Sequence, residues 1–275
     1  MKIPFIKMQG LGNDYIFLDF FNNSFPRIDF MKLANDISNR HFGVGADGLV
    51  LVMPTARFDV KMRMFNADGT EAEMCGNAIR CIAKYVYQHN IVRKSILKID
   101  TLAGEIVAEI LLDKKDIRIA VDMGKPIFSA KEIPVKIDRD TVINYPYYKY
   151  HINCVSVGNP HCVIFVDKIT DDMVLKHGAK LEKADIFPKR INVEFARIIN
   201  RDEIKMRVWE RGTGETLSCG TGAVAVAASA YINNLVDKKV TVHLLGGVLE
   251  IEIMNNGNFR MIGPAEEVFY GEYLW

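Results

Sequence analysis

The 275-residue sequence has no excess of charge of one sign and no long apolar run. Lysine and arginine number 35 against 34 aspartates and glutamates, so the charge favours neither nucleic acid nor an anionic membrane as a partner. The longest run of small apolar residues, Ala223 to Ala230, is too short to span a bilayer. The first ten residues lack the apolar stretch of a signal peptide. We therefore expect a cytoplasmic protein that does not contact a membrane.

Paired cysteine motifs and cofactor fingerprints are also missing. The five cysteines are odd in number and include no Cys-x-x-Cys pair, which argues against a zinc site, a thioredoxin-type site and a disulfide framework. The glycine-rich run Gly43 to Gly48 lacks the lysine of a phosphate loop and predicts an ordinary loop. The sequence thus predicts reduced cysteines, no metal and no cofactor. For Cys81, Cys154 and Cys162 we expect the common role of small buried core residues.

What the sequence does contain is a weak internal repeat. The segments Phe65 to Cys75 and Trp209 to Cys219 each place an aromatic residue ten positions, and a glutamate four positions, before a Cys-Gly pair. The two cysteines are 144 positions apart, about half the chain. A Gly-Asn pair at Gly12 also recurs at Gly158, 146 positions later. Two landmarks at nearly equal offset predict a duplicated domain.

The secondary-structure pattern of the two halves agrees with this duplication. Runs of β-branched and aromatic residues predict strands at Tyr15–Asp19, Val60–Phe65, Ile96–Asp100, Glu105–Leu111 and Ile117–Asp122 in the first half, and at His151–Val157, Cys162–Val166, Glu203–Trp209, Val240–Leu244 and Val248–Ile253 in the second. Each half has an amphipathic helix before its cysteine, capped by Asp29 in the first half and by Thr170 or Asp171 in the second.

More apolar helices follow the two cysteines, at Ala78–Gln88 and Ala223–Ile232. The second is apolar on nearly every face, which predicts burial on all sides. We therefore expect a mixed α/β (α+β) fold of two pseudosymmetric domains, each a β-sheet wrapped around a central helix. The best candidate linker is Gly124 to Pro134, which predicts domains at 1–122 and 123–263.

A cysteine at the start of a helix has a distinctive chemistry. Unpaired N–H groups and the helix dipole favour its thiolate, so we expect a lowered pKa for Cys75 and Cys219. The same N–H groups bind a carboxylate, and the glycine after each cysteine permits close approach. If two such helix starts face one α-carbon, one thiolate removes its proton and the opposite thiol supplies another. The pair therefore predicts a cofactor-independent amino-acid epimerase.

Five motifs in this order and spacing resemble diaminopimelate epimerase over essentially the whole chain. They are Gly10-Leu-Gly-Asn-Asp-Tyr15, Phe65 to Cys75, Gly158-Asn-Pro-His161, Trp209-Glu-Arg-Gly-Thr-Gly-Glu-Thr216 and Cys219-Gly-Thr-Gly-Ala223. The resemblance implies interconversion of LL- and meso-diaminopimelate, on the route to lysine and peptidoglycan precursors. It also implies a homodimer, with the C-terminal tail 264–275 returning to the first domain.

The resemblance also assigns site residues. It implies that Cys75 and Cys219 are the acid and base, and that His161 and Glu210 assist proton handling and orient the reacting amine. Backbone N–H groups of Gly76, Asn77, Gly220 and Thr221 would hold the reacting carboxylate. The far end of the small-molecule substrate would be bound by Asn13, Asn66, Asn159, Asn192 and Arg211, since an arginine can hold a carboxylate through two hydrogen bonds.

One position departs from the family pattern, and three other functions compete. Gly48 stands where some members carry a glutamine that reaches the substrate, so one distal contact would be missing or made by water. A related two-cysteine racemase of histidine or proline would keep both cysteines; proline racemases typically have a histidine where this chain has Asn77. A thiol hydrolase would need only one cysteine with His161 as its base. A non-catalytic amino-acid-binding protein would bind the substrate without turnover.

Overall fold

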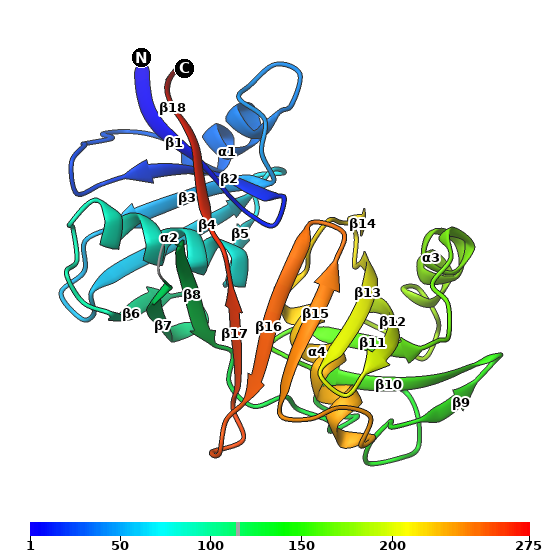
Figure 1. The fold of residues 1–275 in the computed structure, drawn as a ribbon. Helices are drawn as coiled ribbons and strands as arrows, with labels where there is room; N and C mark the ends of the chain where they lie inside the picture. Colours follow the sequence, from blue (N-terminus) through cyan, green and yellow to red (C-terminus); the bar gives the residue numbers. More distant parts are fainter. Residues whose placement is uncertain (114–115) are drawn as a thin grey trace. The chain divides into compact units, whose positions relative to one another are not determined.

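The computed structural model describes residues 1–113 and 116–275, and the chain divides into two compact units (Figure 1). Unit 1 consists of Met1–Val121 and Gly263–Trp275, and unit 2 of Asp122–Ile262. Each unit contains one long ladder of strands and few helices, which confirms the mixed α/β fold class. In the part of the chain that the structure describes, no helix is long and apolar enough to span a bilayer.

The strands of unit 1 pair in the order β18-β1-β2-β3-β4-β6-β7-β8, with the short β5 on β4. Among these described strand pairs, β2–β3 and β4–β6 are parallel and the others antiparallel. The strands are β1 (Lys2–Gly10), β2 (Asn13–Asp19), β3 (Gly48–Met53), β4 (Val60–Asn66), β5 (Glu71–Ala72), β6 (Ile96–Thr101), β7 (Gly104–Asp113), β8 (Asp116–Asp122) and β18 (Glu266–Leu274).

Unit 2 repeats this pattern as β9-β10-β11-β12-β13-β15-β16-β17, with the short β14 on β13. Here the parallel pairs are β11–β12 and β13–β15, at the corresponding places. The strands are β9 (Tyr145–Tyr147), β10 (Tyr150–Ser156), β11 (Pro160–Phe165), β12 (Asn192–Asn200), β13 (Glu203–Glu210), β14 (Gly214–Glu215), β15 (Lys239–Leu244), β16 (Gly247–Ile253) and β17 (Phe259–Gly263). The equal order of parallel and antiparallel pairs is the structural counterpart of the sequence repeat.

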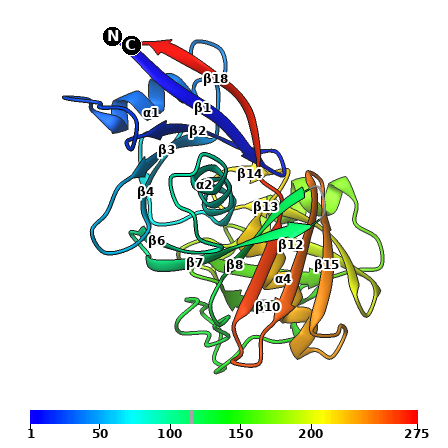
Figure 2. The same ribbon diagram turned by 60° about the vertical axis from the view of Figure 1, so that its left-hand side comes forward.

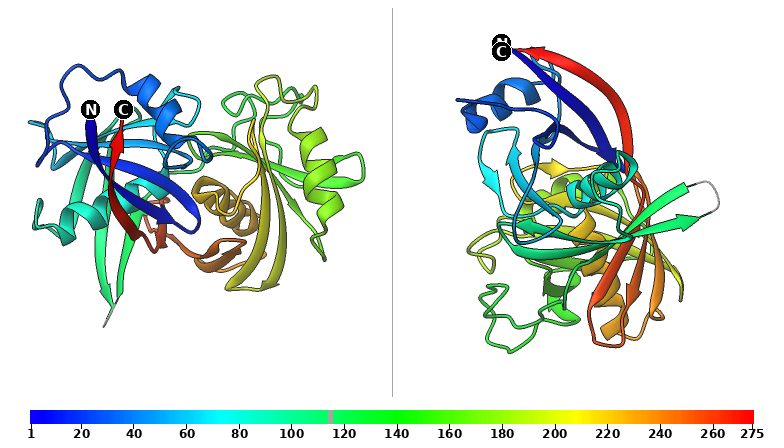
Figure 3. Two further views of the ribbon diagram at one scale, coloured as in Figure 1. Left: turned by 90° about the horizontal axis from the view of Figure 1, so that it is seen from above. Right: turned by 90° about the vertical axis from the view of Figure 1, so that its left-hand side faces the viewer.

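Each ladder curls around one helix. In unit 1 this is α2 (Gly76–Gln88), which Figure 2 shows end-on among the strands. In unit 2 it is α4 (Gly220–Ile232), drawn in gold in Figure 3, which contacts β10, β11, β12, β13, β15 and β16. The run Ala223–Ala230 is buried throughout, as its all-round apolar character predicts.

Both central helices begin at the predicted cysteines. Cys75 and Cys219 have extended backbone conformations (φ −141° and −130°) and are the N-cap residues. The helices therefore start at Gly76 and Gly220, slightly earlier than the expected Ala78 and Ala223.

A repeated ion pair holds the short strand before each cysteine. Arg63 Nε lies 2.7 Å from Glu71 Oε1, and its Nη2 donates to the other oxygen at 3.1 Å. In unit 2 the Arg207 guanidinium contacts Glu215 in the same two-point way, at 2.7 and 3.0 Å. Each arginine lies on the long strand next to the short one, so each pair clamps β5 or β14. The glutamates four positions before the cysteines are thus structural.

The helices that precede the cysteines differ in type. In unit 1, α1 (Phe30–Ser38) begins as expected, with the Asp29 carboxylate accepting from the N–H groups of Met31 and Lys32. In unit 2 the expected α-helix is a π-helix, η1 (Asp172–Gly178), followed by a single α-turn, α3 (Ala179–Leu181). The apolar spacing of Met173, Val174 and Leu181 predicted where this helix lies but not its hydrogen-bond pattern.

The boundary between the two units falls between Val121 and Asp122, just before the segment Gly124 to Pro134, and that segment packs within unit 2. Ile127 forms a β-bridge with Ser156 of β10. Ala130 and Ile133 are 2% exposed and belong to the apolar core of unit 2. The two chain ends meet in unit 1, where β1 and β18 pair antiparallel from Lys2 with Leu274 onward (Figures 1 and 3).

Candidate active site

In unit 1, Cys75 is surrounded by groups from the first strand pair. The Tyr15 hydroxyl of β2 lies 3.2 Å from Cys75 Sγ, and the thiol contacts Asn13 Oδ1 at 3.7 Å. Tyr15 is buried and its pKa is raised well above the ordinary value, chiefly by that burial, so its hydroxyl stays protonated. Because the thiol hydrogen of Cys75 is directed to Asn13 Oδ1, the hydroxyl is the donor in its contact with the sulfur. The structure thus brings Asn13 and Cys75 together, and it adds Tyr15.

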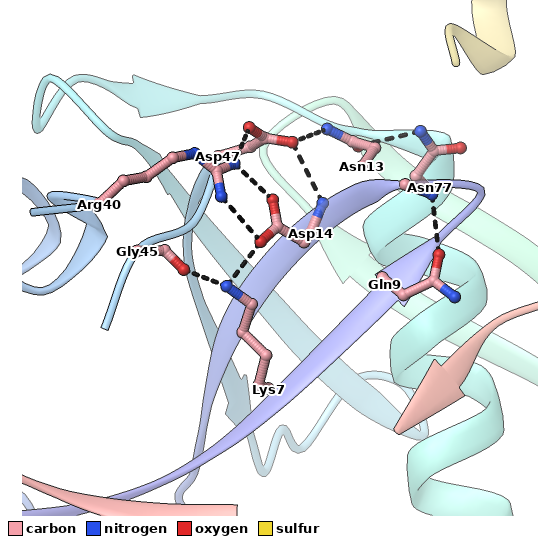
Figure 4. Close-up of polar contacts among 9 residues, drawn as sticks. Lys7, Gln9, Asn13, Asp14, Arg40, Gly45, Asp47 and Asn77 are labelled. Atoms are coloured by element: carbon pink, nitrogen blue, oxygen red, sulfur yellow. Dashed lines mark hydrogen bonds and ion pairs between the residues drawn. The ribbon is translucent and has the colours of Figure 1, made fainter. Parts of the chain in front are cut away.

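The Asn13 side chain is fixed from two directions. Its Oδ1 accepts from Asn77 Nδ2 at 2.9 Å, and its Nδ2 donates to Asp47 Oδ2 at 2.7 Å (Figure 4). Asn77 is the second residue of α2, so this hydrogen bond joins the helix start to β2. Because both ends of the amide have partners, the orientation of Asn13 beside the thiol is determined.

A partly exposed charge network supports Asp47. Arg40 bridges Asp14 and Asp47 at 2.7 and 2.8 Å, and Lys7 lies 2.5 Å from Asp14 (Figure 4). Burial opposes ionisation of Asp14, but Arg40 and Lys7 outweigh it and hold its pKa below the ordinary value. Lys7 also donates to the carbonyl of Gly45 in the glycine-rich segment, which is a loop as predicted. The network is therefore structural support for Asn13.

In unit 2, Cys219 is buried at the start of α4. Its Sγ lies 3.5 Å from Thr221 Oγ1. Glu210, the last residue of β13, accepts a hydrogen bond from the Thr216 hydroxyl. Thr221 and Glu210 were both predicted site residues: Thr221 lies in the first turn of α4, and the short β14 and its loop connect Glu210 to the cysteine.

His161 is fully buried on β11 and has a partner on each ring nitrogen. Nδ1 lies 2.6 Å from Glu194 Oε1 on the neighbouring β12, and Nε2 lies 2.8 Å from Asn159 Oδ1. The predicted residues Asn159 and His161 are therefore in direct contact. Glu194, which is also fully buried, was not predicted.

Of the remaining predicted side chains, Asn192 and Arg211 are in contact with each other, and Asn66 lies in unit 1. Asn192 starts β12, accepts from the Arg211 N–H at 2.8 Å and donates to the Pro160 carbonyl at 3.0 Å. The exposed Arg211 guanidinium contacts the Lys189 carbonyl at 3.3 Å. Asn66 ends β4 and donates to the Thr70 hydroxyl at 3.0 Å.

The expectation of lowered thiol pKa values is wrong. Burial raises the pKa of Cys75, although the Tyr15 hydroxyl, two first-turn N–H groups and the Arg80 charge oppose it. Burial raises the pKa of Cys219 well above its ordinary value, and the carboxylates of Glu210 and Glu194 add to this. The helix start favours each thiolate but is outweighed. The charges nearby nevertheless distinguish the two sulfurs: cationic at Cys75, anionic at Cys219.

This difference predicts a difference in alkylation. Cys219→Ser leaves Cys75 as the reactive site thiol, and Cys75→Ser leaves Cys219. A higher pKa means less thiolate at a given pH, so we expect the pH midpoint of iodoacetamide alkylation to be lower for Cys75. Tyr15→Phe should raise that midpoint, because the hydroxyl no longer donates to the sulfur. Tyr85→Phe is the control: Tyr85 is buried in the same unit but donates to Asp19. A lower midpoint for Cys219 would contradict the assignment.

Known proteins are similar to this chain in sequence, and others are similar to it in fold. Residues 5–129 and 153–268 match the diaminopimelate epimerase family. The chain is 48% identical over 274 residues to a diaminopimelate epimerase of Acetivibrio thermocellus, covering 98% of this chain and 97% of that protein. It is 46% identical over 276 residues to a diaminopimelate epimerase of Methanococcus maripaludis, covering 98% and 99%.

Solved structures of more distant proteins are similar in fold. A phenazine biosynthesis protein of the PhzF family from Bacillus anthracis superimposes with a TM-score of 0.72 at 15% identity, covering 100% of both chains. A hydroxyproline epimerase from Agrobacterium vitis gives a TM-score of 0.67 at 11% identity, covering 98% of this chain and 90% of that one. At these identities the likeness concerns the fold alone. With the family match across most of its length, the chain belongs to the diaminopimelate epimerase family and is an isomerase.

Proposed function

We propose that this chain interconverts LL- and meso-2,6-diaminopimelate, with Cys75 and Cys219 as a two-base pair that uses no cofactor. The observation that carries the proposal is the equivalence of the two cysteines. Each caps the central helix of one ladder, follows a clamped short strand and precedes a glycine. Inversion of an α-carbon needs one group that takes a proton and a second that returns one, and a duplicated thiol provides both.

The reacting carboxylate would be held by the helix starts. N–H groups of the first turn have no acceptor within their helix and attract anions. In this role we propose Gly76 and Asn77 of α2, and Gly220 and Thr221 of α4. As the α-proton leaves, charge develops on the carboxylate oxygens, and fixed N–H donors stabilise it by about 3 kcal/mol per donor. This stabilisation offsets the weak acidity of the α-hydrogen.

The other polar side chains would orient the rest of the substrate. Glu210, whose carboxylate lies near Cys219, would assist proton transfer at the reacting amine. His161, in contact with Asn159, would orient that amine. For the distal amino acid we propose Asn13, Asn66, Asn159, Asn192 and Arg211. The exposed guanidinium of Arg211 suits a second carboxylate, because its planar fork can donate two parallel hydrogen bonds.

The test is deuterium incorporation at the α-carbon in heavy water, followed by mass spectrometry for LL-diaminopimelate, L-histidine and L-proline in parallel. We expect incorporation, with inversion, for diaminopimelate alone. Exchange of proline or histidine instead would contradict the substrate assignment. Tight binding of diaminopimelate with no incorporation would contradict catalysis, and an acyl-enzyme mass adduct would indicate a thiol hydrolase.

The setting of the enzyme follows from this chemistry. Two free thiols must stay reduced, as they do in the cytoplasm, and we propose that location. The product would feed lysine and peptidoglycan precursor synthesis. We also propose a homodimer, for which β18 offers exposed apolar side chains at Val268, Phe269, Tyr270 and Leu274; sedimentation velocity measures this state.

A further inference from the structure

The buried carboxyl group of Glu194 has no assigned role. Its side chain is fully inaccessible to solvent, and its Oε1 lies 2.6 Å from Nδ1 of the equally buried His161. Its Oε2 has no hydrogen-bond partner among the described residues. A carboxyl group in such surroundings is costly to bury unless it is paired or protonated. Its burial beside His161 therefore calls for a functional explanation.

The hydrogen-bond pattern of His161 fixes the number of protons in this pair. Nε2 lies 2.8 Å from Asn159 Oδ1, and because an amide oxygen only accepts, Nε2 must carry a hydrogen. Nδ1 and Glu194 Oε1 then share one further proton. It lies on nitrogen in an imidazolium–carboxylate pair, or on oxygen in a neutral imidazole–carboxylic acid pair. Both forms hold the same number of protons and carry no net charge.

The alternative form is disfavoured by the same contacts. A neutral imidazole with its hydrogen on Nδ1 would leave Nε2 bare, and two acceptors would then lie 2.8 Å apart. That form would also leave a net negative charge in a fully buried site. Burial already raises the pKa of Glu194, with Glu210 adding to the rise and His161 opposing it. A shared proton is consistent with all of these effects.

Glu194 also lies close to the predicted catalytic sulfur of its unit. A Cβ placed on Gly222 would be 3.0 Å from Glu194 Oε1 and 3.3 Å from Cys219 Sγ, so both groups border the same glycine of α4. The titratable groups around the carboxyl are His161 and Cys162 of β11, Glu210 of β13 and Cys219 at the start of α4. His161 is the partner in hydrogen-bond contact that can share a proton with it.

We propose that Glu194 is a positioning residue for the epimerase reaction: it shares a proton with Nδ1 of His161, keeps Nε2–H donated to Asn159, and so fixes the imidazole and the Asn159 amide that orient the substrate amine. This rests on the proposed function, in which His161 orients that amine. A glutamine at position 194 can donate its amide N–H to Nδ1 and preserve the Nε2–H form. A methionine of similar size cannot.

The first experiment needs no activity. Nitrogen-15 NMR of the wild-type protein, labelled at its six histidines and assigned with His161→Gln, reports whether Nε2 is protonated. We expect Nε2 to carry a hydrogen, because Asn159 Oδ1 accepts from it. A bare Nε2, with the Asn159 amide turned over to donate to it, would overturn the proposal even if the enzyme is fully active.

The second experiment compares two variants. Glu194→Met should lower kcat roughly tenfold or more while KM changes little, because His161 loses its fixed protonated form. Glu194→Gln should restore kcat to within about threefold of wild type. If Glu194 had only a packing role, the methionine variant would have a kcat equal to or higher than that of the glutamine variant. Equal kcat in folded Met and Gln variants would therefore refute the proposal. If the methionine variant does not fold, a glutamine variant that folds but is inactive would refute the proposal.

A matched control exists in the same unit. Glu203 Oε1 lies 2.7 Å from His243 Nε2, but about a third of each side chain is exposed, and neither is part of the proposed site. Glu203→Met and Glu203→Gln should leave kcat and KM unchanged. A wild-type protein that shows the protonated Nε2 but does not epimerise diaminopimelate would count against the proposed function and not against the proton shared by Glu194.

Discussion

Cys75→Ala and Cys219→Ala are each expected to lower kcat for diaminopimelate inversion by at least about 10³-fold, within the range that a general acid or base contributes. Alanine removes the sulfur but keeps the N-cap backbone, so α2 and α4 should still form. The two losses should be of similar size, because inversion uses one thiol as the base and the other as the acid in either direction. The rate of conversion of LL- to meso-diaminopimelate, measured by chromatography that separates the two isomers, gives kcat for each variant.

The stereochemistry of residual exchange sharpens the test. A variant with one remaining thiol can remove a proton and return a deuteron only on one face, so any exchange should occur with retention. The two variants should then label opposite stereoisomers at the reacting centre. Cys81→Ala is the control: Cys81 lies on the same helix as Cys75 but is fully buried, so its loss should affect stability and not inversion. Inversion at the wild-type rate in either site variant would contradict the two-base mechanism.

The repeat was the feature that the sequence predicted best. Its landmarks, the Gly-Asn pairs and the Cys-Gly pairs, mark turns and helix starts, where local residue chemistry determines structure. The strand order then follows twice, with parallel pairs at matching places. Four of the long strands, β1, β3, β12 and β18, were not predicted. Of these, β1 and β18 pair the two ends of the chain, and strand formation depends on such distant partners.

The sequence predicted some site residues and missed others, and the reason differs from one residue to the next. Motifs identified Asn13, Cys75, Asn159 and His161, which lie in short segments with recognisable spacing. Tyr15 was within reach of the sequence, since it ends the motif that contains Asn13. Glu194 was not, because a glutamate on a strand reads as a surface residue until its burial against His161 is known.

The sign of the thiol pKa shifts shows the same limit. The position of a cysteine at a helix start is visible in the sequence, and alone it predicts a lowered pKa. Burial, the largest cause, depends on the strands packed around each central helix, and it reverses the sign; the carboxylates of Glu210 and Glu194 add to it at Cys219. Local electrostatics can therefore be read from a motif, but the net pKa needs the tertiary structure.

Gly48 gives the second large expected effect. A Cβ at this position would lie 2.3 Å from the Phe65 carbonyl oxygen, far inside contact distance. The residue pairs with Tyr15 on one side and Asn66 on the other, so its backbone is held within the ladder and has little freedom to move. We expect Gly48→Ala to lower the free energy of unfolding by about 3 kcal/mol, measured by urea denaturation.

Gly104→Ala separates this clash from the general cost of replacing glycine. Gly104 lies in the same unit with a φ of +106° and no atom within 4 Å of its Cβ position, so it should lose only about 1–2 kcal/mol from backbone strain. Gly48→Gln should be at least as damaging as Gly48→Ala. It should also raise KM, because the added Cβ would lie 3.4 Å from the Cα of Asn66, a proposed substrate ligand.

A glutamine variant of wild-type stability would show that the β3–β4 register is wrong. A destabilised one would mean that the glutamine of other family members cannot occupy this backbone position, so the distal contact must come from another residue here.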